Sequence, residues 1–342
     1  MRPFSYQHPR STMAALALAA QHVARPGEAR RPAPARYLAG GTNLLDLMKI
    51  GVDHPATLID IAALRQEHGR IEADESGLSL GALVRMAEAA EHPAVLRDYP
   101  AIAQSLQLAA SQQLRNMATL GGNVLQRTRC NYFRDPSWPA CNKRMPGSGC
   151  AAMQGVNRRL AVLGVSEHCI AHYPGDFANV LAAFGAELDL LAPDGTARRI
   201  PFEELHRLPG GTPHIETNLQ PGELITGFRV PAGPWTRRSL YLKIRDRDSY
   251  DFAQASAVVG LDLQDGVVRE ARIGLGGLVA KPWRAHAAEA ALNGQRLDRA
   301  VAEAAAAAAF QDAVTHGENA FKPELGRRTL VRALLQAAAM EA

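Results

Sequence analysis

The sequence lacks the motifs of the common hydrolytic sites. It contains no Gly-x-Ser-x-Gly elbow, no His-Glu-x-x-His pair, no Walker loop and no Cys-x-x-Cys pair. Its histidines, such as His22, His92 and His286, are scattered along the chain. These absences argue against hydrolases and nucleotide-hydrolysing enzymes, because no catalytic constellation of those types can be assembled.

Long apolar runs and basic stripes are also missing. No apolar run approaches the roughly 20 residues that a membrane-spanning helix needs. The net charge of +4 and the pI near 9.0 would suit an acidic partner, but no basic helix or aromatic-basic stripe marks a nucleic-acid surface. With 342 residues and 47% hydrophobic residues, the chain is expected to form two or three globular domains.

A convincing export signal is missing at the N-terminus. Arg10 and the apolar residues 13–20 imitate a signal peptide, but the apolar core is short and Phe4, Tyr6 and His8 precede it. We therefore expect a short strand followed by a helix that Ser11 or Thr12 caps.

Cysteine is scarce, and all four cysteines lie between residues 130 and 169, with ten, eight and eighteen residues between them. Arginines and lysines are interleaved, which would suit a negatively charged thiolate cluster. Four soft ligands in one loop-rich insertion favour a [4Fe-4S] cluster with one cysteine per iron. Zinc, disulfides and buried free thiols remain open, because the spacing excludes none of them.

A glycine turn follows the first expected strand. Residues 35–39 (ARYLA) predict a strand, residues 40–49 (GGTNLLDLMK) a turn and helix, and residues 57–61 (TLIDI) a second strand. Glycines let backbone N–H groups approach a ligand, and Thr42 or Asn43 can cap a helix whose N-terminus faces an anion. A diphosphate would fit such a turn, although the motif is neither a P-loop nor Gly-x-Gly-x-x-Gly, and a plain capped turn remains open.

A second glycine turn occurs at residues 117–123 (MATLGGN). Before it we expect a strand at 77–81 and helices at 83–90 and 101–110. The two turns would bracket one elongated nucleotide cofactor if the fold brings them together, or they are two unrelated turns.

The rest of the chain predicts an α+β arrangement. After the cysteines we expect a helix at 176–184 capped by Asp176, a hairpin at 187–200 and a linker at 208–221. Strands at 223–230, 239–245, 255–263 and 267–275 then predict an antiparallel sheet, followed by helices at 284–292, 297–310 and from 323 to the end. The alanine run 304–309 is expected to be helical because alanine has the highest helix propensity.

Four segments together carry a family resemblance: residues 39–49 (AGGTNLLDLMK), 118–123 (ATLGGN), 173–176 (YPGD) and 241–243 (YLK). In this order they resemble the flavin subunit of the xanthine dehydrogenase family of molybdenum hydroxylases. With its four cysteines, the chain is most similar to the flavin subunit of bacterial periplasmic aldehyde oxidoreductases, whose insertion carries a [4Fe-4S] cluster.

The resemblance implies a mixed α/β (α+β) fold in three parts. These are a first FAD-binding lobe at residues 1–61, a second at 62–222 with the iron–sulfur insertion at 124–170, and a C-terminal α+β domain at 223–342. The lobes would be of the PCMH or vanillyl-alcohol-oxidase-like type, and the last domain of the CO dehydrogenase flavoprotein C-terminal type.

The resemblance also implies FAD, with the diphosphate at the first glycine turn and the flavin flanked by the second. In some relatives an aromatic residue stacks on the flavin, whereas this chain has residues 108–111 (LAAS) there, so the oxidant stays open. The implied cofactor-binding residues are Leu38, Ala39, Gly40, Gly41, Thr42, Asn43, Leu44, Leu45, Met48, Met117, Ala118, Thr119, Gly121, Gly122, Asn123, Asp176, Ile225 and Lys243. The implied cluster ligands are Cys130, Cys141, Cys150 and Cys169.

The implied function is electron transfer within an aldehyde-oxidising complex. A large molybdenum-cofactor subunit would oxidise the aldehyde, and a small [2Fe-2S] subunit would pass electrons to this FAD and on to an external acceptor. We expect a heterotrimer in the periplasm, exported on a twin-arginine signal of the small subunit, with the cytoplasm as the alternative. The alternative functions are a benzoyl-CoA-type reductase subunit and a zinc-stabilised scaffold without a redox role.

Overall fold

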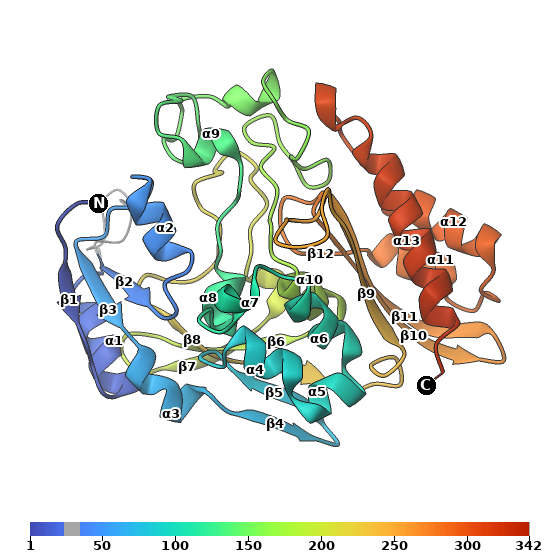
Figure 1. Ribbon diagram of the computed structural model, residues 1–342, viewed down its shortest axis with the longest axis horizontal. Coiled ribbons are helices and arrows are strands. Elements are labelled where there is room, and N and C mark those ends of the chain that lie inside the picture. Colours follow the sequence, from blue (N-terminus) through green and yellow to red (C-terminus); the bar gives the residue numbers. More distant parts are fainter. Residues whose placement is uncertain (24–34, 342) are drawn as a thin grey trace.

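The computed structural model describes residues 1–23 and 35–341 of the chain, which form three sheets with their helices (Figure 1). The first is a parallel sheet of order β1-β3-β2, built from β1 (Ser5–Gln7), β2 (Ala35–Leu38) and β3 (Thr57–Asp60). Helix α1 (Thr12–Ala20) buries Ala15 and Leu16 against Ile59 of β3. The Ser11 hydroxyl accepts a hydrogen bond from Ala14 N, so the expected strand and capped helix at the N-terminus are confirmed.

The first glycine turn lies between β2 and α2 (Leu44–Lys49), as the sequence predicts. Helix α2 begins four residues later than expected, because residues 40–43 form the turn itself. Asn43 occupies the cap position but makes no side-chain cap hydrogen bond. After β3 come the short helices η1 (Ala62–Leu64) and α3 (Arg65–His68).

The second sheet is antiparallel, with the order β4-β5-β8-β6-β7. It contains β4 (Ile71–Asp74), β5 (Gly77–Gly81), β6 (Glu187–Leu191), β7 (Ala197–Pro201) and β8 (Leu224–Pro231). Its apolar side chains share one core with helices α6 and α10, and η3 (Phe202–Glu204) follows β7. The helices of this part are α4 (Met86–Glu91), α5 (Pro93–Asp98), α6 (Pro100–Gln107), α7 (Gln112–Arg115), α8 (Leu120–Val124) and α10 (Phe177–Ala183).

Strand β8 corrects the predicted sheet. The sequence analysis grouped residues 223–230 with the C-terminal sheet, but β8 pairs with β5 and β6 in the middle of the second sheet. Its burial pattern is typical of any half-buried strand, and a sequence pattern of this kind does not determine which strands β8 pairs with. Other elements also differ from the prediction. Strand β4 and helix α5 were not predicted, and α6 ends at Gln107, shortly before Ala110 takes a positive φ of 49°.

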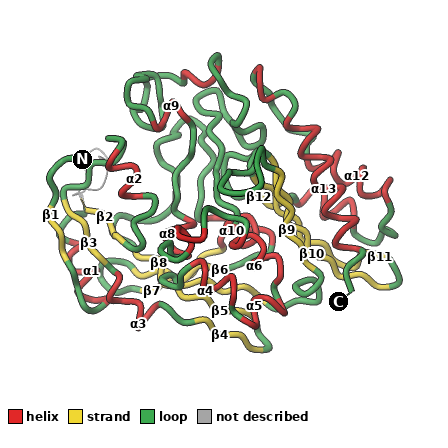
Figure 2. The backbone as a smooth tube through the Cα atoms, in the orientation of Figure 1, coloured by secondary structure: helices red, strands yellow, loops and turns green. Residues whose placement is uncertain are grey.

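The cysteine insertion is mostly loop, as Figure 2 shows. It projects from the top of the molecule in that view and contains only the short helices α9 (Asn131–Arg134) and η2 (Ala151–Met153). With so little regular structure, its shape depends on side-chain contacts and on the cysteines.

The C-terminal part is a four-stranded antiparallel sheet of order β12-β11-β10-β9 with helices on it. The strands are β9 (Ser239–Ile244), β10 (Ala255–Gln264), β11 (Val267–Gly276) and β12 (Trp283–Arg284). The helices are α11 (His286–Leu292), α12 (Arg299–Ala309), η4 (Gly317–Asn319) and α13 (Lys322–Ala338). Ala302, Ala305 and Ala306 of α12 are buried in its core, so the alanine run is helical as predicted.

The structure confirms the predicted α+β class, with lobed N-terminal sheets followed by an antiparallel sheet with helices. In the described part of the chain, each helix is too short or too polar to span a bilayer.

Candidate functional site

The two glycine turns lie directly against each other. A Cβ atom at Gly40 would stand 2.0 Å from the Met117 carbonyl oxygen and 3.0 Å from Ala118 Cα, so only glycine fits there. Gly41 has a φ of +72°, which an L side chain rarely adopts. The fold therefore brings together two motifs that are far apart in the sequence.

The second turn is held in place by backbone hydrogen bonds to the segment after β5. Gly121 N donates to Ala82 O at 2.8 Å and Leu120 N donates to Val84 O at 2.9 Å. The Thr119 hydroxyl accepts from Gly122 N at 3.2 Å, so it caps α8. Tyr173, in the segment before α10, donates to Val124 O at 2.9 Å and fastens the end of α8.

A cleft opens between these turns and the start of β8, with a cavity volume of about 190 Å³. This is less than a drug-sized ligand usually fills, so a dinucleotide would occupy it in part and extend along the open cleft. Of the residues implied by the resemblance, those that line it are Ala39, Gly40, Gly41, Thr42, Asn43, Leu44, Ala118, Thr119, Gly121, Gly122 and Ile225. Those outside its lining are Leu38, Leu45, Met48, Met117, Asn123, Asp176 and Lys243.

Two buried amide groups beside the turns lack a hydrogen-bond partner among the described residues. They are Asn43 Nδ2 at the first turn and Asn123 Oδ1 at the second. The opposite atom of Asn43, Oδ1, accepts from Arg127 N at 3.2 Å. A buried polar atom without a partner is costly, so Asn43 Nδ2, which belongs to a residue that lines the cleft, remains as a donor for a polar ligand.

One end of the cleft is charged. Arg127 donates from Nη1 to Asp53 Oδ1 at 3.0 Å and from Nε to Glu216 Oε1 at 2.8 Å. Burial would raise the pKa of Glu216, but Arg127 and Lys143 lower it to about 2, so this carboxylate is ionised. Arg36 also lines the cleft; its burial lowers its pKa, and no ion pair to it occurs among the described residues. Arg36 thus has positive charge to offer an anionic group, whereas Asp53 and Glu216 balance the charge of Arg127.

Asp176 and Lys243 lie together, and their positions differ from the capping role expected of Asp176. Its carboxylate makes no cap hydrogen bond to α10. Instead Oδ2 lies 2.7 Å from Lys243 Nζ, and Oδ1 accepts from the Tyr241 hydroxyl at 2.5 Å. Lys243 also donates to Leu108 O at 3.1 Å. This buried group joins α10 to β9 and to residues 108–111, where some relatives carry an aromatic residue.

Several residues that line the cleft were missed by sequence reasoning. They are Arg36, Tyr37, Leu47, Asp53, Ile61, Ala82, Leu83, Leu125, Arg127, Glu223 and Leu224. Arg36 could have been predicted as a site residue, because it is an arginine within a short strand that leads into a glycine turn. Arg127 was noted only as a neighbour of the cysteines.

The four cysteines lie in one cluster. Cys130, Cys141 and Cys169 are buried and Cys150 is partly buried in the same group as Phe133 and Leu47. Cys141 and Cys150 face each other across an antiparallel bridge. All four are free thiols in the described part of the chain, so the structure does not support the disulfide interpretation.

The thiols affect one another. Burial, with smaller effects of the neighbouring Cys169 and Cys141, raises the pKa of Cys130 to about 12. Burial likewise raises the pKa of Cys169 to about 11, whereas Lys143 lowers it. Three buried thiols and one partly buried thiol in one cluster form a donor set suited to soft metals. Among the described residues, however, no group of three or more His, Cys, Asp or Glu side chains is arranged to hold a metal ion.

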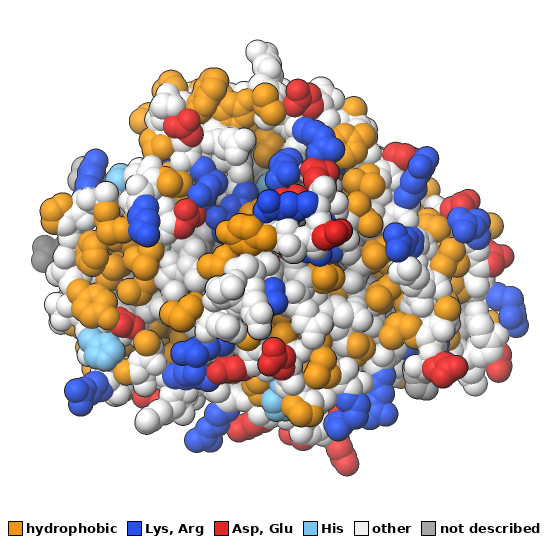
Figure 3. All heavy atoms as spheres, in the orientation of Figure 1, with side chains coloured by type: hydrophobic (Ala, Val, Ile, Leu, Met, Phe, Trp, Pro, Cys, Tyr) orange, Lys and Arg blue, Asp and Glu red, His pale blue; other side chains and the backbone are white. Residues whose placement is uncertain are grey.

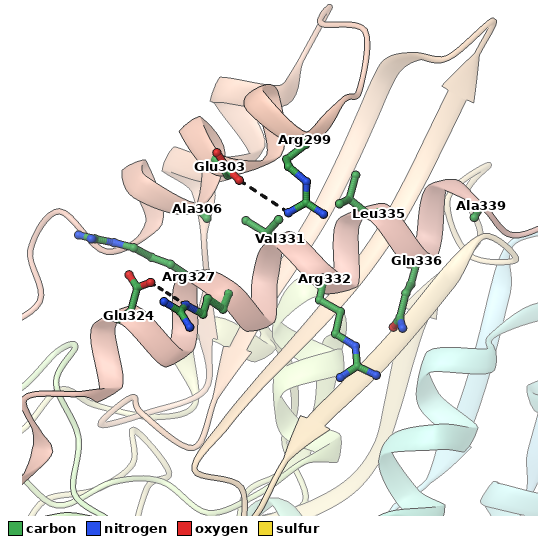
Figure 4. Close-up of a pocket in the computed structure, with 11 residues that line it drawn as sticks. Arg299, Glu303, Ala306, Glu324, Arg327, Val331, Arg332, Leu335, Gln336 and Ala339 are labelled. Carbon is green, nitrogen blue, oxygen red and sulfur yellow. Dashed lines mark hydrogen bonds and ion pairs between the residues drawn. The ribbon is translucent and has the colours of Figure 1, made fainter.

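A larger groove of about 770 Å³ lies on the C-terminal helices (Figure 4). Its floor includes Ala306, Val331 and Leu335, and Arg327 and Arg332 extend along its rim. No residue of either glycine turn lines it. Size alone would select this groove, but the paired turns and the unpartnered amides favour the smaller cleft as the functional site.

The surface around the insertion is apolar at its tip and basic below it. Trp138, Met145 and Val156 are exposed, and Figure 3 shows hydrophobic atoms gathered at the top of the molecule, where Figure 1 places the insertion. Lys and Arg side chains gather beneath that tip in the same view.

The comparisons with known proteins give consistent similarities. A family model described as the FAD binding domain in molybdopterin dehydrogenase matches residues 2–233, and one described as the CO dehydrogenase flavoprotein C-terminal domain matches residues 240–341. The chain is 45% identical, over 99% of both chains, to the aldehyde oxidoreductase FAD-binding subunit PaoB of Escherichia coli K12. It is 26% identical to the carbon monoxide dehydrogenase medium chain of Afipia carboxidovorans, over 90% of this chain and 85% of that one.

Among solved structures, the chain resembles one from reconstituted CO dehydrogenase of Oligotropha carboxidovorans. The TM-score is 0.75 at 24% identity, and all of both chains is covered. That likeness concerns the fold.

Proposed function

Because this chain belongs to the xanthine dehydrogenase family of FAD-binding medium subunits, we propose that it is the flavin-bearing electron-transfer subunit of an aldehyde-oxidising molybdenum hydroxylase. The observation that carries the proposal is the cleft between two glycine turns in contact, with unpartnered amide groups beside it. Bound FAD would supply the ability to accept electrons singly and release them in pairs.

The residues of the cleft fit FAD. The first turn can approach the diphosphate closely, since Gly40 and Gly41 carry no side chain, and Arg36 contributes positive charge. Asn43 Nδ2 offers a donor. Ile225 brings an apolar surface from β8. These residues bind and orient the cofactor and exclude water from part of it, while the chemistry belongs to the cofactor.

We further propose that Cys130, Cys141, Cys150 and Cys169 hold a [4Fe-4S] cluster. Two observations support this: the four free thiols lie in one largely buried cluster, and Arg127 and Lys143 lie near Cys141 and Cys169. A single zinc ion needs four donors about 2.0–2.3 Å from one centre. A cluster instead takes one thiolate per iron, which suits thiols that are near one another without converging on a point. Positive neighbours would favour its reduced, more negative form.

The proposed partners are a small [2Fe-2S] subunit, which delivers electrons, and a large molybdenum-cofactor subunit, which oxidises the aldehyde. An external acceptor takes the electrons from FAD. The exposed Trp138, Met145 and Val156 support assembly, because apolar patches on a surface mark interaction sites. For the compartment we propose the periplasm, reached by co-export with a signal-bearing partner subunit.

The decisive experiment is co-expression with the neighbouring subunits, followed by an inventory of flavin, iron and zinc. We expect one FAD and about four irons per chain. Replacement Cys141→Ser should abolish the cluster absorbance. A colourless complex with zinc alone would instead indicate the scaffold function.

Substrate assays and fractionation test the remaining parts. Reduction of the bound flavin by aromatic or aliphatic aldehydes is expected. Oxidation of the reduced flavin by a benzoyl-CoA-type substrate, with no flavin reduction by aldehydes, would contradict aldehyde oxidation. Recovery of the complex in the periplasmic fraction is expected; recovery in the cytoplasm alone would overturn that localisation.

A further inference from the structure

The cysteine insertion is fastened to the first glycine turn through one carboxylate. Asp46 is the third residue of α2, directly after the turn. Arg134 donates to it from Nη1 and Nη2, at 2.8 Å to Oδ2 and 3.0 Å to Oδ1. Arg129 donates from Nη1 to Oδ2 at 3.3 Å. These two arginines stand on either side of Cys130, so Asp46 holds the loop both before and after that thiol.

The contact has the geometry of a strong charge-assisted pair. The two Arg134 hydrogen bonds form a bidentate fork, which adds directionality to the attraction. Hydrogen bonding from Arg134 lowers the pKa of Asp46, against the opposing effect of partial burial. Asp46 is only 34% exposed and the two arginines are less so, which places the contact between the surface and the interior.

Helix α2 depends on such contacts. It has six residues and no side-chain cap, and so short a helix is not stable by itself. Its Leu47 packs in the same apolar group as the four cysteines and also lines the cleft. One side of α2 therefore faces the thiols, while the turn before it forms the cleft.

We propose that Asp46 is a positioning residue that couples the two sites, so that metal occupancy of the cysteine insertion strengthens FAD binding. This rests on the proposed function. Metal bound by Cys130, Cys141, Cys150 and Cys169 ties together loops that otherwise have little regular structure. The ordered loop fixes Arg129 and Arg134, these fix Asp46, and α2 then holds residues 40–43 in the shape that receives FAD. Such coupling is reciprocal: FAD must slow the loss of metal by the same linkage.

Arg127 provides a second connection, since its backbone N–H donates to Asn43 Oδ1 and its side chain to Asp53 and Glu216. It lines the cleft itself, so replacing it would change FAD binding directly. Asp46 lines neither site and is the better residue to test.

The experiment is a double cycle of metal removal and substitution. Flavin fluorescence gives the FAD dissociation constant of the full chain reconstituted anaerobically with iron and sulfide, and again after chelation. In the native chain we expect chelation to weaken FAD binding roughly fivefold or more, within the range usual for coupled sites. In Asp46→Asn that factor should fall below about twofold. Asp46→Glu should restore part of it.

The matched control is Glu324→Gln, which neutralises the acid of another arginine pair, at Arg328 on α13. It should behave as the native chain. If circular dichroism shows that Asp46→Asn is poorly folded, Arg134→Gln is tested in its place. The measurement is then the rate at which a chelator removes iron from Arg134→Gln with and without FAD. An equal metal effect in native and Asp46→Asn chains, or none in the native chain, overturns the coupling alone. A chain that binds no FAD in any metal state removes the proposed function as well.

Discussion

At the scale of single residues, Gly40 shows how a backbone contact shapes the cleft. Its missing side chain is what lets the first turn reach Met117 and Ala118. Backbone atoms cannot move aside as the end of a flexible side chain can. Any Cβ atom at this position must therefore separate the turns.

We accordingly predict that Gly40→Ala lowers FAD affinity by about tenfold or more, which corresponds to about 1.4 kcal/mol of lost binding free energy. Flavin retained after gel filtration and the dissociation constant from fluorescence provide the measurement. Gly211→Ala is the control, because nothing lies within 4 Å of a Cβ atom there. Equal FAD affinity in both variants would show that the turns are not in contact.

Lys322 is a second residue whose surroundings matter, because its burial changes its pKa. It is fully buried, and its amine donates to Gly277 O at 2.7 Å and to Arg159 O at 3.0 Å. Burial lowers the pKa of Lys322 to about 7, from 10.5 in the unfolded chain. It links α13 to the segment that follows Cys150.

The second prediction concerns pH. Between about pH 7 and pH 10.5 the unfolded chain binds a proton at Lys322 that the native chain does not, so the free energy of unfolding rises with pH there. The contribution of neutral Lys322 to the free energy of unfolding is complete above pH 10.5. It is lost progressively as the pH falls from 10.5 to 7. Urea midpoints of the native chain should therefore rise with pH relative to those of Lys322→Met. Parallel curves for the two proteins would contradict the lowered pKa.

Sequence analysis could identify site residues whose type is fixed by steric constraints. The glycines and the amides of the two turns are visible because a close backbone approach restricts the choice of residue. Arg36 and Asp53 were missed, since a charged residue in a strand or loop has many possible partners. The contact between Asp176 and Lys243 was also out of reach, because it depends on where β9 packs.

At the scale of elements, a buried ion pair joins α10 to β9. Asp176 and Lys243 are 5% and 1% exposed, and Tyr241 donates to the same carboxylate. Breaking such a pair leaves one charge buried without compensation, which is strongly destabilising. The pair thus connects the second lobe to the C-terminal sheet.

We predict that Asp176→Asn and Lys243→Met each lower the free energy of unfolding by about 3–5 kcal/mol, and that the double variant loses much less than their sum. Urea denaturation of the three variants and the native chain completes the cycle. Strictly additive losses would mean that the two side chains do not interact in solution.

Elements were predicted well where local pattern determines them and poorly where pairing does. The strand, turn and helix at residues 35–49 and the alanine helix followed from local sequence. The place of β8 did not, because helices and the cysteine insertion separate its partner β5 from it in the chain, and β7 and a linker lie between it and β6. Strand pairing is a tertiary choice.

At the scale of the whole molecule, the cleft depends on the N-terminal lobe, the α8 turn and the start of β8 staying together. A ligand that binds only this assembled state must stabilise the fold by mass action. At a free FAD concentration of 100 times the dissociation constant, we predict a gain of about 2.7 kcal/mol in the free energy of unfolding. Urea titrations at several FAD concentrations test this, and Gly40→Ala should show a much smaller gain at the same concentrations.

The central place of β8 also sets the timing of biosynthesis. The ribosome must add roughly 190 residues after Gly40 before β8 is complete, which takes roughly 10 to 40 s at typical elongation rates. During that interval the first turn has emerged without the strand that brings Ile225 to it. Flavin capture therefore cannot precede the synthesis of β8, and a nascent chain arrested before residue 224 should carry none.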